Sequence, residues 1–261
     1  MNSLGRRHLI SLVVAGLALV ACSSDDPPAS DTSTRSAESA LTVFAAASLT
    51  DAFTEIGNAF MAQYPDTTIT FNFAASSELV TQINEGAPAD VFASADLSNM
   101  SKLTDADNNG SEPVEFATNQ GEIIVAPGNP LGIASVADLA NDDLIVVVCA
   151  PEVPCGKYAA AIFENAGVTV TAKSLEENVK AVVAKVTLGE ADAGIVYSTD
   201  VRAAADAATG VAIPADINVV AQYPIVVTKD APNPKGAQAF IDFVTGPQGQ
   251  QILASYGFTT P

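Results

Sequence analysis

From residue 41 onward, short apolar runs typical of buried strands alternate with segments whose apolar residues recur at helical spacing. Strands are expected at 41–45, 69–73, 89–93, 123–125, 144–148, near Val168, at 193–197 and at 224–228. Helices are expected at 52–60, 79–83, 136–140, 157–165, 179–188, 237–244 and 252–256. Strands that alternate with helices indicate an α/β fold with a mostly parallel sheet covered on both faces.

The N-terminal segment has the pattern of an export signal. Arg6 and Arg7 precede the apolar stretch Leu9–Val20, which is too short for a stable membrane anchor. The stretch ends in the residues LVAC, which resemble a bacterial lipobox, so residues 1–21 are predicted to be a lipoprotein signal peptide and Cys22 to be acylated. The alternative is an ordinary secretory peptide cleaved nearby, with Cys22 incidental. Residues 22–40 are polar and patternless, and they predict a flexible tether to the outer face of the cytoplasmic membrane.

Cleavage of this signal changes the chemistry open to the chain. It would remove two of the 11 basic residues, which leaves nine against 30 acidic ones and a net charge of −21. So acidic a protein is not expected to bind nucleic acid or anionic lipid through a basic face. The only histidine, His8, would leave as well, and with it the commonest general base and metal ligand. We therefore expect no enzyme, no catalytic residues and no cofactor.

The two remaining cysteines, Cys149 and Cys155, lie in the segment CAPEVPC. An exported compartment permits disulfides, and the two intervening prolines can turn the chain back on itself. We expect Cys149 and Cys155 to be paired. The alternatives are two free buried thiols or a reactive Cys155.

Several junctions between a predicted strand and the next helix carry a small polar residue or a glycine and no basic residue. The junctions are Ser48, Ser76 with Ser77, Gly156 and Asn178. Helix capping would explain each of them singly. In a doubly wound sheet, however, such junctions meet at the carboxyl ends of the strands, where ligands bind. Helix N-termini that converge there present unpaired N–H groups and positive dipole ends, which favour an anion.

The same junctions carry a family resemblance. Motifs along the chain resemble, in the same order, those of the molybdate-binding proteins of bacterial ABC importers. They are FAAASLT (44–50) with FAASS (73–77), GAPADVFASAD (86–96), VPCGKYA (153–159), NVK (178–180) and AGIVYSTD (193–200). The match runs from about Leu41 to Phe258, which is nearly all of the mature chain.

The resemblance implies a type II periplasmic-binding-protein fold, with two doubly wound α/β lobes and a ligand cleft between them. Lobe 1 is expected to comprise residues 41–118 and 223–261, and lobe 2 residues 119–222. The crossings near 117–120 and 221–224 should act as hinges. The protein would be a monomer that captures molybdate or tungstate and passes it to the permease of an ABC importer.

The resemblance also implies a set of ligand contacts. They are the hydroxyl and amide of Ser48 and of Ser76, the amides of Cys155 and Val179, and the phenol of Tyr197. The chain departs from the family at Cys155, where the family often has alanine, and an amide contact tolerates that change. If Cys155 were a free thiol, its place among the contacts would be in doubt.

Three other functions remain open at this point. The first is a receptor for another tetrahedral oxyanion such as sulfate or phosphate. The second is an enzyme with Cys155 or Ser48 as nucleophile, which would lack a histidine and have only Lys157 as a nearby cation. The third is a purely structural surface lipoprotein, which would not need these motifs in this order.

Overall fold

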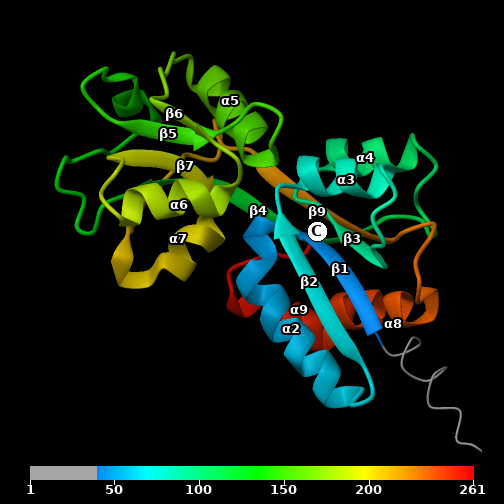
Figure 1. Ribbon diagram of the computed structural model, residues 1–261. Coiled ribbons are helices and arrows are strands. Elements are labelled where there is room, and N and C mark those ends of the chain that lie inside the picture. The colour runs from blue at the N-terminus through cyan, green and yellow to red at the C-terminus, as the bar shows by residue number, and fades with distance from the viewer. Residues whose placement is uncertain (1–39) are drawn as a thin grey trace, which may run out of the picture. The chain divides into compact units, whose positions relative to one another are not determined.

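The computed structural model describes residues 40–261 (Figure 1). The predicted signal peptide, the predicted lipidation of Cys22 and all but the last residue of the predicted tether lie outside the described residues. The strands are β1 (Ala40–Ala46), β2 (Thr68–Ala74), β3 (Val91–Ala93), β4 (Val114–Val125), β5 (Val146–Cys149), β6 (Ser174–Glu176), β7 (Ala193–Tyr197), β8 (Thr209–Ala212) and β9 (Val220–Val227). The α-helices are α2 (Thr50–Gln63), α3 (Ser76–Asn84), α4 (Leu97–Thr104), α5 (Pro154–Ala166), α6 (Val179–Thr187), α7 (Ser198–Ala204), α8 (Pro234–Thr245) and α9 (Pro247–Ser255). Short 3₁₀ helices are η1 (Ala47–Leu49), η2 (Val136–Ala140) and η3 (Ala205–Ala207).

The strands form one hydrogen-bonded path in the order β2-β1-β3-β9-β4-β7-β5-β6, and β8 pairs with β4. The long strand β4 connects the two halves of this path, because residues 114–120 pair with β9 and residues 121–125 pair with β7. We call β1, β2, β3 and β9 with η1, α2, α3, α4, α8 and α9 the first lobe. We call β5, β6, β7 and β8 with η2, α5, α6, α7 and η3 the second lobe.

Only half of the strand pairs are parallel, so the expectation of a mostly parallel sheet was wrong. The pairs β1–β2, β1–β3, β5–β6 and β5–β7 are parallel, whereas β4 and β9 pair antiparallel with all their neighbours. A strand that is buried on both faces appears in the sequence as an apolar run, whether it pairs parallel or antiparallel. The hydrophobic pattern therefore does not show the direction of pairing. Every antiparallel pair involves β4 or β9, the two strands that contain the predicted crossings.

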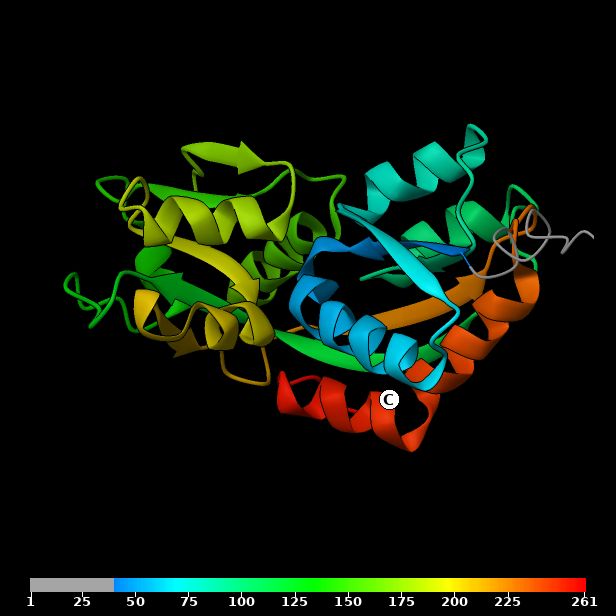
Figure 2. The ribbon, with the colours of Figure 1, turned by 60° about the horizontal axis from the view of Figure 1, so that its bottom comes forward.

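In the first lobe, helices cover both faces of the sheet (Figure 2). Val43 and Val91 belong to the same core cluster as Phe53 of α2, whereas Phe44 and Phe92 belong to the core cluster that includes α3 and α4. Because successive side chains of a strand point to opposite faces, this division places α2, α8 and α9 on one face and α3 and α4 on the other. The expected doubly wound architecture is confirmed here.

The second lobe is built in the same way. Ile123 packs in one cluster with η2 and α5, and its neighbour Ile124 packs in the other cluster with α6. The strand expected near Val168 was wrong: Val168 is in no strand, and it packs against the core in irregular chain after the left-handed Gly167. The pattern also missed α4, α7, β6 and β8, which are short elements of three to eight residues.

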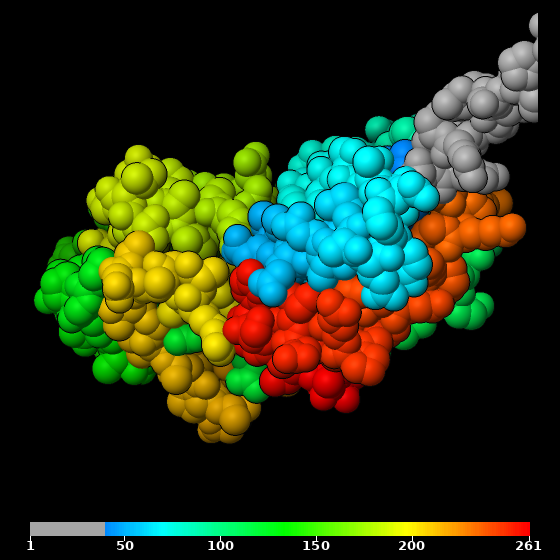
Figure 3. Space-filling model, turned by 90° about the horizontal axis from the view of Figure 1, so that it is seen from below, coloured from blue at the N-terminus to red at the C-terminus, as the bar shows by residue number. Residues whose placement is uncertain are grey.

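The predicted hinge segments lie side by side in the structure. Ala117 pairs with Tyr223 and Asn119 with Ala221, and Thr118 also forms an isolated bridge to Thr259. Figure 3 shows the helices of the first lobe meeting α6 and α7 of the second lobe along a seam on one face. The exact lobe boundaries and the hinge function remain predictions.

Candidate anion site between the lobes

All five predicted contact residues line one small cavity, although they come from widely separated parts of the chain. Ser48 and Ser76 belong to the first lobe, and Cys155, Val179 and Tyr197 belong to the second. The cavity measures about 10 Å³, roughly the room that one water molecule needs. Its full lining is Ala46, Ala47, Ser48, Ala74, Ala75, Ser76, Ala95, Val153, Pro154, Cys155, Asn178, Val179 and Tyr197.

The cavity lies at the N-terminal ends of helices from both lobes. Ser76 is the first residue of α3, Val179 is the first residue of α6, and Cys155 is the second residue of α5. Ser48 lies in η1, which leads directly into α2. The first N–H groups of a helix have no acceptor within the helix, and the helix dipole makes this end positive. The backbone therefore supplies donors and positive potential to the cavity.

Helix capping explains Asn178 but not the two serines. The Asn178 side chain accepts a hydrogen bond from the N–H of Ala181 at 3.1 Å, so it caps α6. Ser48 Oγ instead lies 3.0 Å from the hydroxyl of Tyr223, and Ser76 Oγ accepts the N–H of Ala95 at 3.0 Å. Neither serine therefore caps its helix, and both residues line the cavity.

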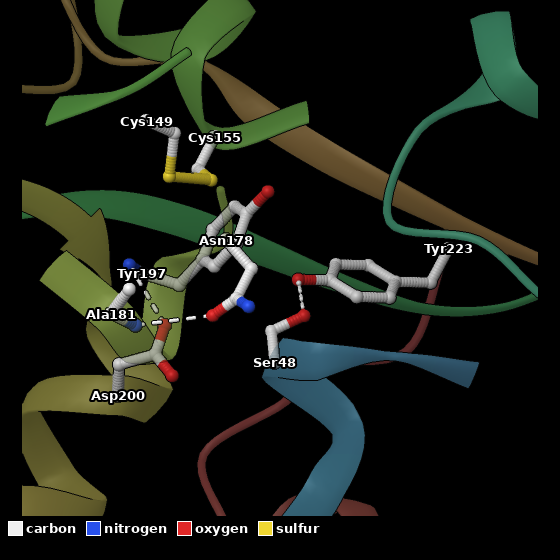
Figure 4. The surroundings of a disulfide bond; sticks show 8 residues. All are labelled: Ser48, Cys149, Cys155, Asn178, Ala181, Tyr197, Asp200 and Tyr223. Atoms are coloured by element: carbon white, nitrogen blue, oxygen red, sulfur yellow. Dashed lines mark hydrogen bonds between the residues drawn. A yellow bond between two sulfur atoms is a disulfide. The ribbon is translucent and has the colours of Figure 1, made fainter. Parts of the chain in front are cut away.

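Tyr197 presents a buried hydroxyl without a partner. Its side chain is nearly fully buried, and within residues 40–261 no hydrogen-bond partner reaches its hydroxyl oxygen. Burial raises the pKa of Tyr197 well above its usual value, and the neighbouring tyrosines and carboxylates raise it further. The phenol therefore keeps its proton at neutral pH, and its hydroxyl can donate a hydrogen bond to a ligand in the cavity. Figure 4 shows the Tyr197 ring beside Asn178, below the disulfide.

Cys149 and Cys155 form a disulfide, as predicted (Figure 4). It joins the end of β5 to the first turn of α5, and so it closes the loop that places the Cys155 amide at the cavity. Closing a seven-residue loop stabilises by about 2–2.5 kcal/mol in the chain-entropy model. The following Gly156 allows this turn, because a Cβ atom there would lie 2.0 Å from the carbonyl oxygen of Ala150. A reactive Cys155 thiol is excluded in this structure.

The charged side chains lie around the cavity rather than in its lining. Lys157 of the second lobe forms an ion pair with Asp96 of the first at 2.8 Å. Lys180 bridges the lobes at another point, with Asp51 at 2.8 Å and Asp200 at 3.4 Å. We call these two ion-pair groups the rim. Lys157, the cation that could have assisted a nucleophile, is therefore paired with a carboxylate.

Burial has opposite consequences for the two charges of the Lys180 group. It raises the pKa of Asp200 to about 6, although Lys180 and the N–H of Tyr197 lower it in part. Burial also disfavours the charged form of Lys180, but Asp200 and Asp51 more than offset this, so the pKa of Lys180 is raised. Lys180 therefore stays protonated and holds Asp51 and Asp200 together.

Two residues near the cavity were not predicted as contacts. Asn178 lines the cavity as well as capping α6, and Tyr223 reaches Ser48 from β9 without lining the cavity itself. Asn178 was recognised as a helix-opening residue, but nothing in the pattern of β9 distinguished Tyr223 from a core tyrosine. Among the described residues, no cluster of three or more His, Cys, Asp or Glu side chains could hold a metal ion. No described helix is long and apolar enough to cross a membrane.

Residues 41–259 match the family described as bacterial extracellular solute-binding proteins. The chain is 43% identical over 251 residues to the molybdate-binding protein ModA of Mycobacterium tuberculosis, covering 96% of this chain and 95% of that protein. It is 29% identical over 255 residues to the putative ABC transporter substrate-binding lipoprotein YvgL of Bacillus subtilis, covering 96% of each. The periplasmic molybdate-binding protein of Azotobacter vinelandii has the same fold, with a TM-score of 0.75 at 20% identity, over 85% of this chain and 99% of that one.

The chain belongs to the bacterial extracellular solute-binding proteins. Its fold is that of the periplasmic binding proteins, as the resemblance implied, and the matched family consists of binding proteins rather than enzymes. The chain is accordingly not an enzyme, and a solute in this family is a bound ligand and not a cofactor.

Proposed function

We propose that this protein binds molybdate, and tungstate in the same way, in the cavity between the lobes and delivers it to the permease of an ABC importer. The observation that carries this proposal is a cavity with no charged side chain in its lining, surrounded by hydrogen-bond donors from both lobes. The donors are the amides and hydroxyls of Ser48 and Ser76, the amides of Cys155 and Val179, and the hydroxyl of Tyr197. The similarity to a molybdate-binding protein over 96% of the chain supports the same ligand.

The number of donors suits a dianion. A doubly charged oxyanion loses a large hydration energy when it enters a protein, and the site must replace it. Seven charge-assisted hydrogen bonds at about 1.5–3 kcal/mol each, with several helix ends at about 0.3–2 kcal/mol, are of the required order.

The donor set further predicts which oxyanion binds. Molybdate and tungstate are fully deprotonated at neutral pH and only accept hydrogen bonds. Phosphate keeps a proton that would face a donor, at a cost of about 1–3 kcal/mol for the unsatisfied pair. Sulfate has the right protonation but is smaller, so its oxygens cannot meet every donor of a site sized for a metal oxyanion. We expect molybdate and tungstate to bind alike, sulfate much more weakly, and phosphate least.

Titration calorimetry with these four anions tests the function and its main alternative together. Tyr197→Phe removes one donor and should weaken molybdate roughly tenfold or more without lowering the melting temperature of the free protein. Tyr256→Phe is the matched control, because the Tyr256 hydroxyl binds Glu55 on α2 and does not line the cavity. Sulfate binding tighter than molybdate would favour the sulfate receptor. Phosphate as tight as molybdate would mean that a carboxylate reaches the ligand.

We also propose that the two lobes move when the ligand enters. The cavity is enclosed by residues of both, and the paired segments near 117–120 and 221–224 are the proposed hinges between residues 41–118 with 223–261 and residues 119–222. Small-angle scattering should then show a smaller radius of gyration with molybdate. An unchanged radius would contradict closure but not binding.

The proposed location is the outer face of the cytoplasmic membrane, with the protein anchored by lipid on Cys22. The support is the lipobox-like segment 19–22 and the similarity to a protein named as a substrate-binding lipoprotein. Wild type should enter the detergent phase in a phase-separation experiment, and Cys22→Ala should stay in the aqueous phase. A wild-type protein found wholly in the aqueous phase would contradict the anchor.

A further inference from the structure

Behind the cavity, a fully buried tyrosine is hydrogen-bonded to one of the proposed contacts. Tyr223 of β9 has no exposed surface, and its hydroxyl lies 3.0 Å from Ser48 Oγ. Figure 4 shows the Tyr223 side chain extending toward Ser48, with the dashed bond joining the two oxygens. Tyr223 itself is outside the cavity lining, so it acts on a ligand through its neighbours: its hydroxyl contacts Ser48, and its ring packs against the ring of Tyr197.

The hydrogen bond between two hydroxyls has two possible directions. If Ser48 donated to Tyr223, the Tyr223 proton would need another acceptor, and Ser48 would turn its lone pairs toward the anion. If Tyr223 donates to Ser48, both protons are used, because the Ser48 proton then points to the ligand. An anion in the cavity therefore favours donation from Tyr223 to Ser48, because this direction satisfies the Tyr223 proton and also turns the Ser48 proton toward the anion.

The surroundings of Tyr223 offer no better acceptor for its proton. Asn119 lies nearby, but its Oδ1 already accepts the N–H of Gln120 at 2.9 Å and the hydroxyl of Ser198 at 3.0 Å. These bonds fix the orientation of the amide, and its Nδ2 donates to Thr199 Oγ1 at 2.8 Å. On its other sides the Tyr223 ring packs edge-on against Phe116 and Phe258. Asn119 therefore acts on the Tyr223 hydroxyl only as a donor, and among the described residues Ser48 is left as the acceptor for the Tyr223 proton.

Tyr223 is also able to act as a permanent donor. Burial raises the pKa of Tyr223 far above neutrality, so the phenol keeps its proton at every pH at which the protein works. Its strand is paired on both sides, because β9 pairs with β3 at residues 225–227 and with β4 at residues 220–225.

We propose that Tyr223 is a positioning residue that holds Ser48 as an obligatory hydrogen-bond donor toward the oxyanion and thereby excludes protonated oxyanions. This inference rests on the proposed function, since it concerns the selectivity of that same site. The proton of Tyr223 occupies one of the two lone pairs of Ser48 Oγ, so the Ser48 proton cannot point to Tyr223, and one lone pair fewer is available to the proton of hydrogen phosphate or hydrogen arsenate. Removing the Tyr223 hydroxyl frees this lone pair.

Calorimetry on Tyr223→Phe with molybdate and arsenate tests the proposal. Molybdate should bind about fivefold to tenfold more weakly, as expected for one lost hydrogen bond that orients a donor. Arsenate should lose less or gain affinity, so the ratio between the two affinities narrows. A merely structural role would weaken both anions equally. Tyr256→Phe is the control and should leave both affinities unchanged.

A double-mutant cycle with Ser48→Ala isolates the route of the effect. In the Ser48→Ala background, Tyr223→Phe should change the molybdate affinity by less than about twofold. An unchanged affinity ratio in Tyr223→Phe, or an equal loss in the Ser48→Ala background, would overturn this inference while leaving the proposed function intact. Wild type that fails to bind molybdate would overturn both.

Discussion

The cavity and its rim lie at the same junction between the lobes, but they are built from opposite kinds of groups. The cavity is lined by alanines, neutral hydroxyls and helix N-termini, and no charged side chain lines it. The rim consists of lysines that are paired with carboxylates from both lobes. In a strongly acidic protein that is proposed to bind a dianion, these two lysines therefore join the lobes and do not line the ligand site.

This difference shows how selectivity and closure can be separated. Fixed amides and hydroxyls discriminate between anions by size and protonation, because each donor points in one direction and forms a hydrogen bond only over a narrow range of distances. A lysine in the cavity would attract any anion as a point charge. Ion pairs across the rim depend only on whether the lobes are together.

The largest effect is expected from a charge placed inside the cavity. Ser48→Asp introduces a carboxylate that occupies the helix N-termini and repels the ligand. Molybdate affinity should fall by about a thousandfold or more, which is the size of effect expected from a buried like charge. Ser48→Asn has nearly the same shape without the charge, and it should retain far more affinity. Calorimetry with circular dichroism as a folding check measures both. Binding retained in Ser48→Asp would contradict a cavity that works by donors alone.

The next effect concerns the stability of the rim and its dependence on pH. The pKa of Asp200 is raised to about 6 in the folded protein, against about 3.9 in an unfolded chain. The folded state therefore binds this proton more tightly, and the stability it contributes is present below about pH 4 and is lost as pH rises through 6. The loss is on the order of 3 kcal/mol.

The unfolding free energy of Asp200→Asn should lack this pH-dependent contribution of Asp200. The difference in unfolding free energy between wild type and Asp200→Asn, measured with urea from acid to neutral pH, should fall by that amount. Taking the difference cancels the contributions of the other carboxylates. A difference that stays flat or rises with pH would show that the Lys180 ion pair outweighs the burial of Asp200.

A single backbone donor can be removed by proline. Val179 is the first residue of α6, where proline is tolerated, and the preceding Asn178 is extended, as a residue before proline should be. Val179→Pro should weaken molybdate about 10-fold to 150-fold, the equivalent of one charge-assisted hydrogen bond. Val179→Ala keeps the amide and loses only packing, and so it is the control. Equal affinities of the two variants would exclude the Val179 amide as a contact.

The smallest effect is expected at the rim. Lys157→Met breaks the ion pair with Asp96 across the lobes, and it should weaken every anion by about threefold to tenfold, mainly through faster release. Lys185→Met is the control, because Lys185 pairs with Glu176 and Glu190 within the second lobe. Stopped-flow release and an anion panel would check this. A change in the ranking of the anions would show that Lys157 takes part in recognition.

Much of this architecture could be predicted from local patterns. The strand Ala193–Tyr197 matches its predicted range, and most other strands and helices differ only by a few residues at their ends. These elements have strong local signals, because apolar runs and helical spacing reflect burial on one or both faces. The prediction of a strand near Val168 was wrong because the hydrophobic pattern reports burial alone, and a buried apolar stretch need not pair its backbone with another strand.

The sequence by itself determined which residues could serve an anion: small polar residues at helix starts, two closely spaced cysteines, and no histidine after residue 8. The tertiary structure decided how these residues act. Whether Ser48 caps a helix or contacts Tyr223, 175 positions away, depends on which strands become neighbours. The same holds for Lys157 and Lys180, which pair with Asp96 and Asp51 of the other lobe. Such contacts between distant segments follow from the pairing of β4 with β9, and no local pattern in the chain records it.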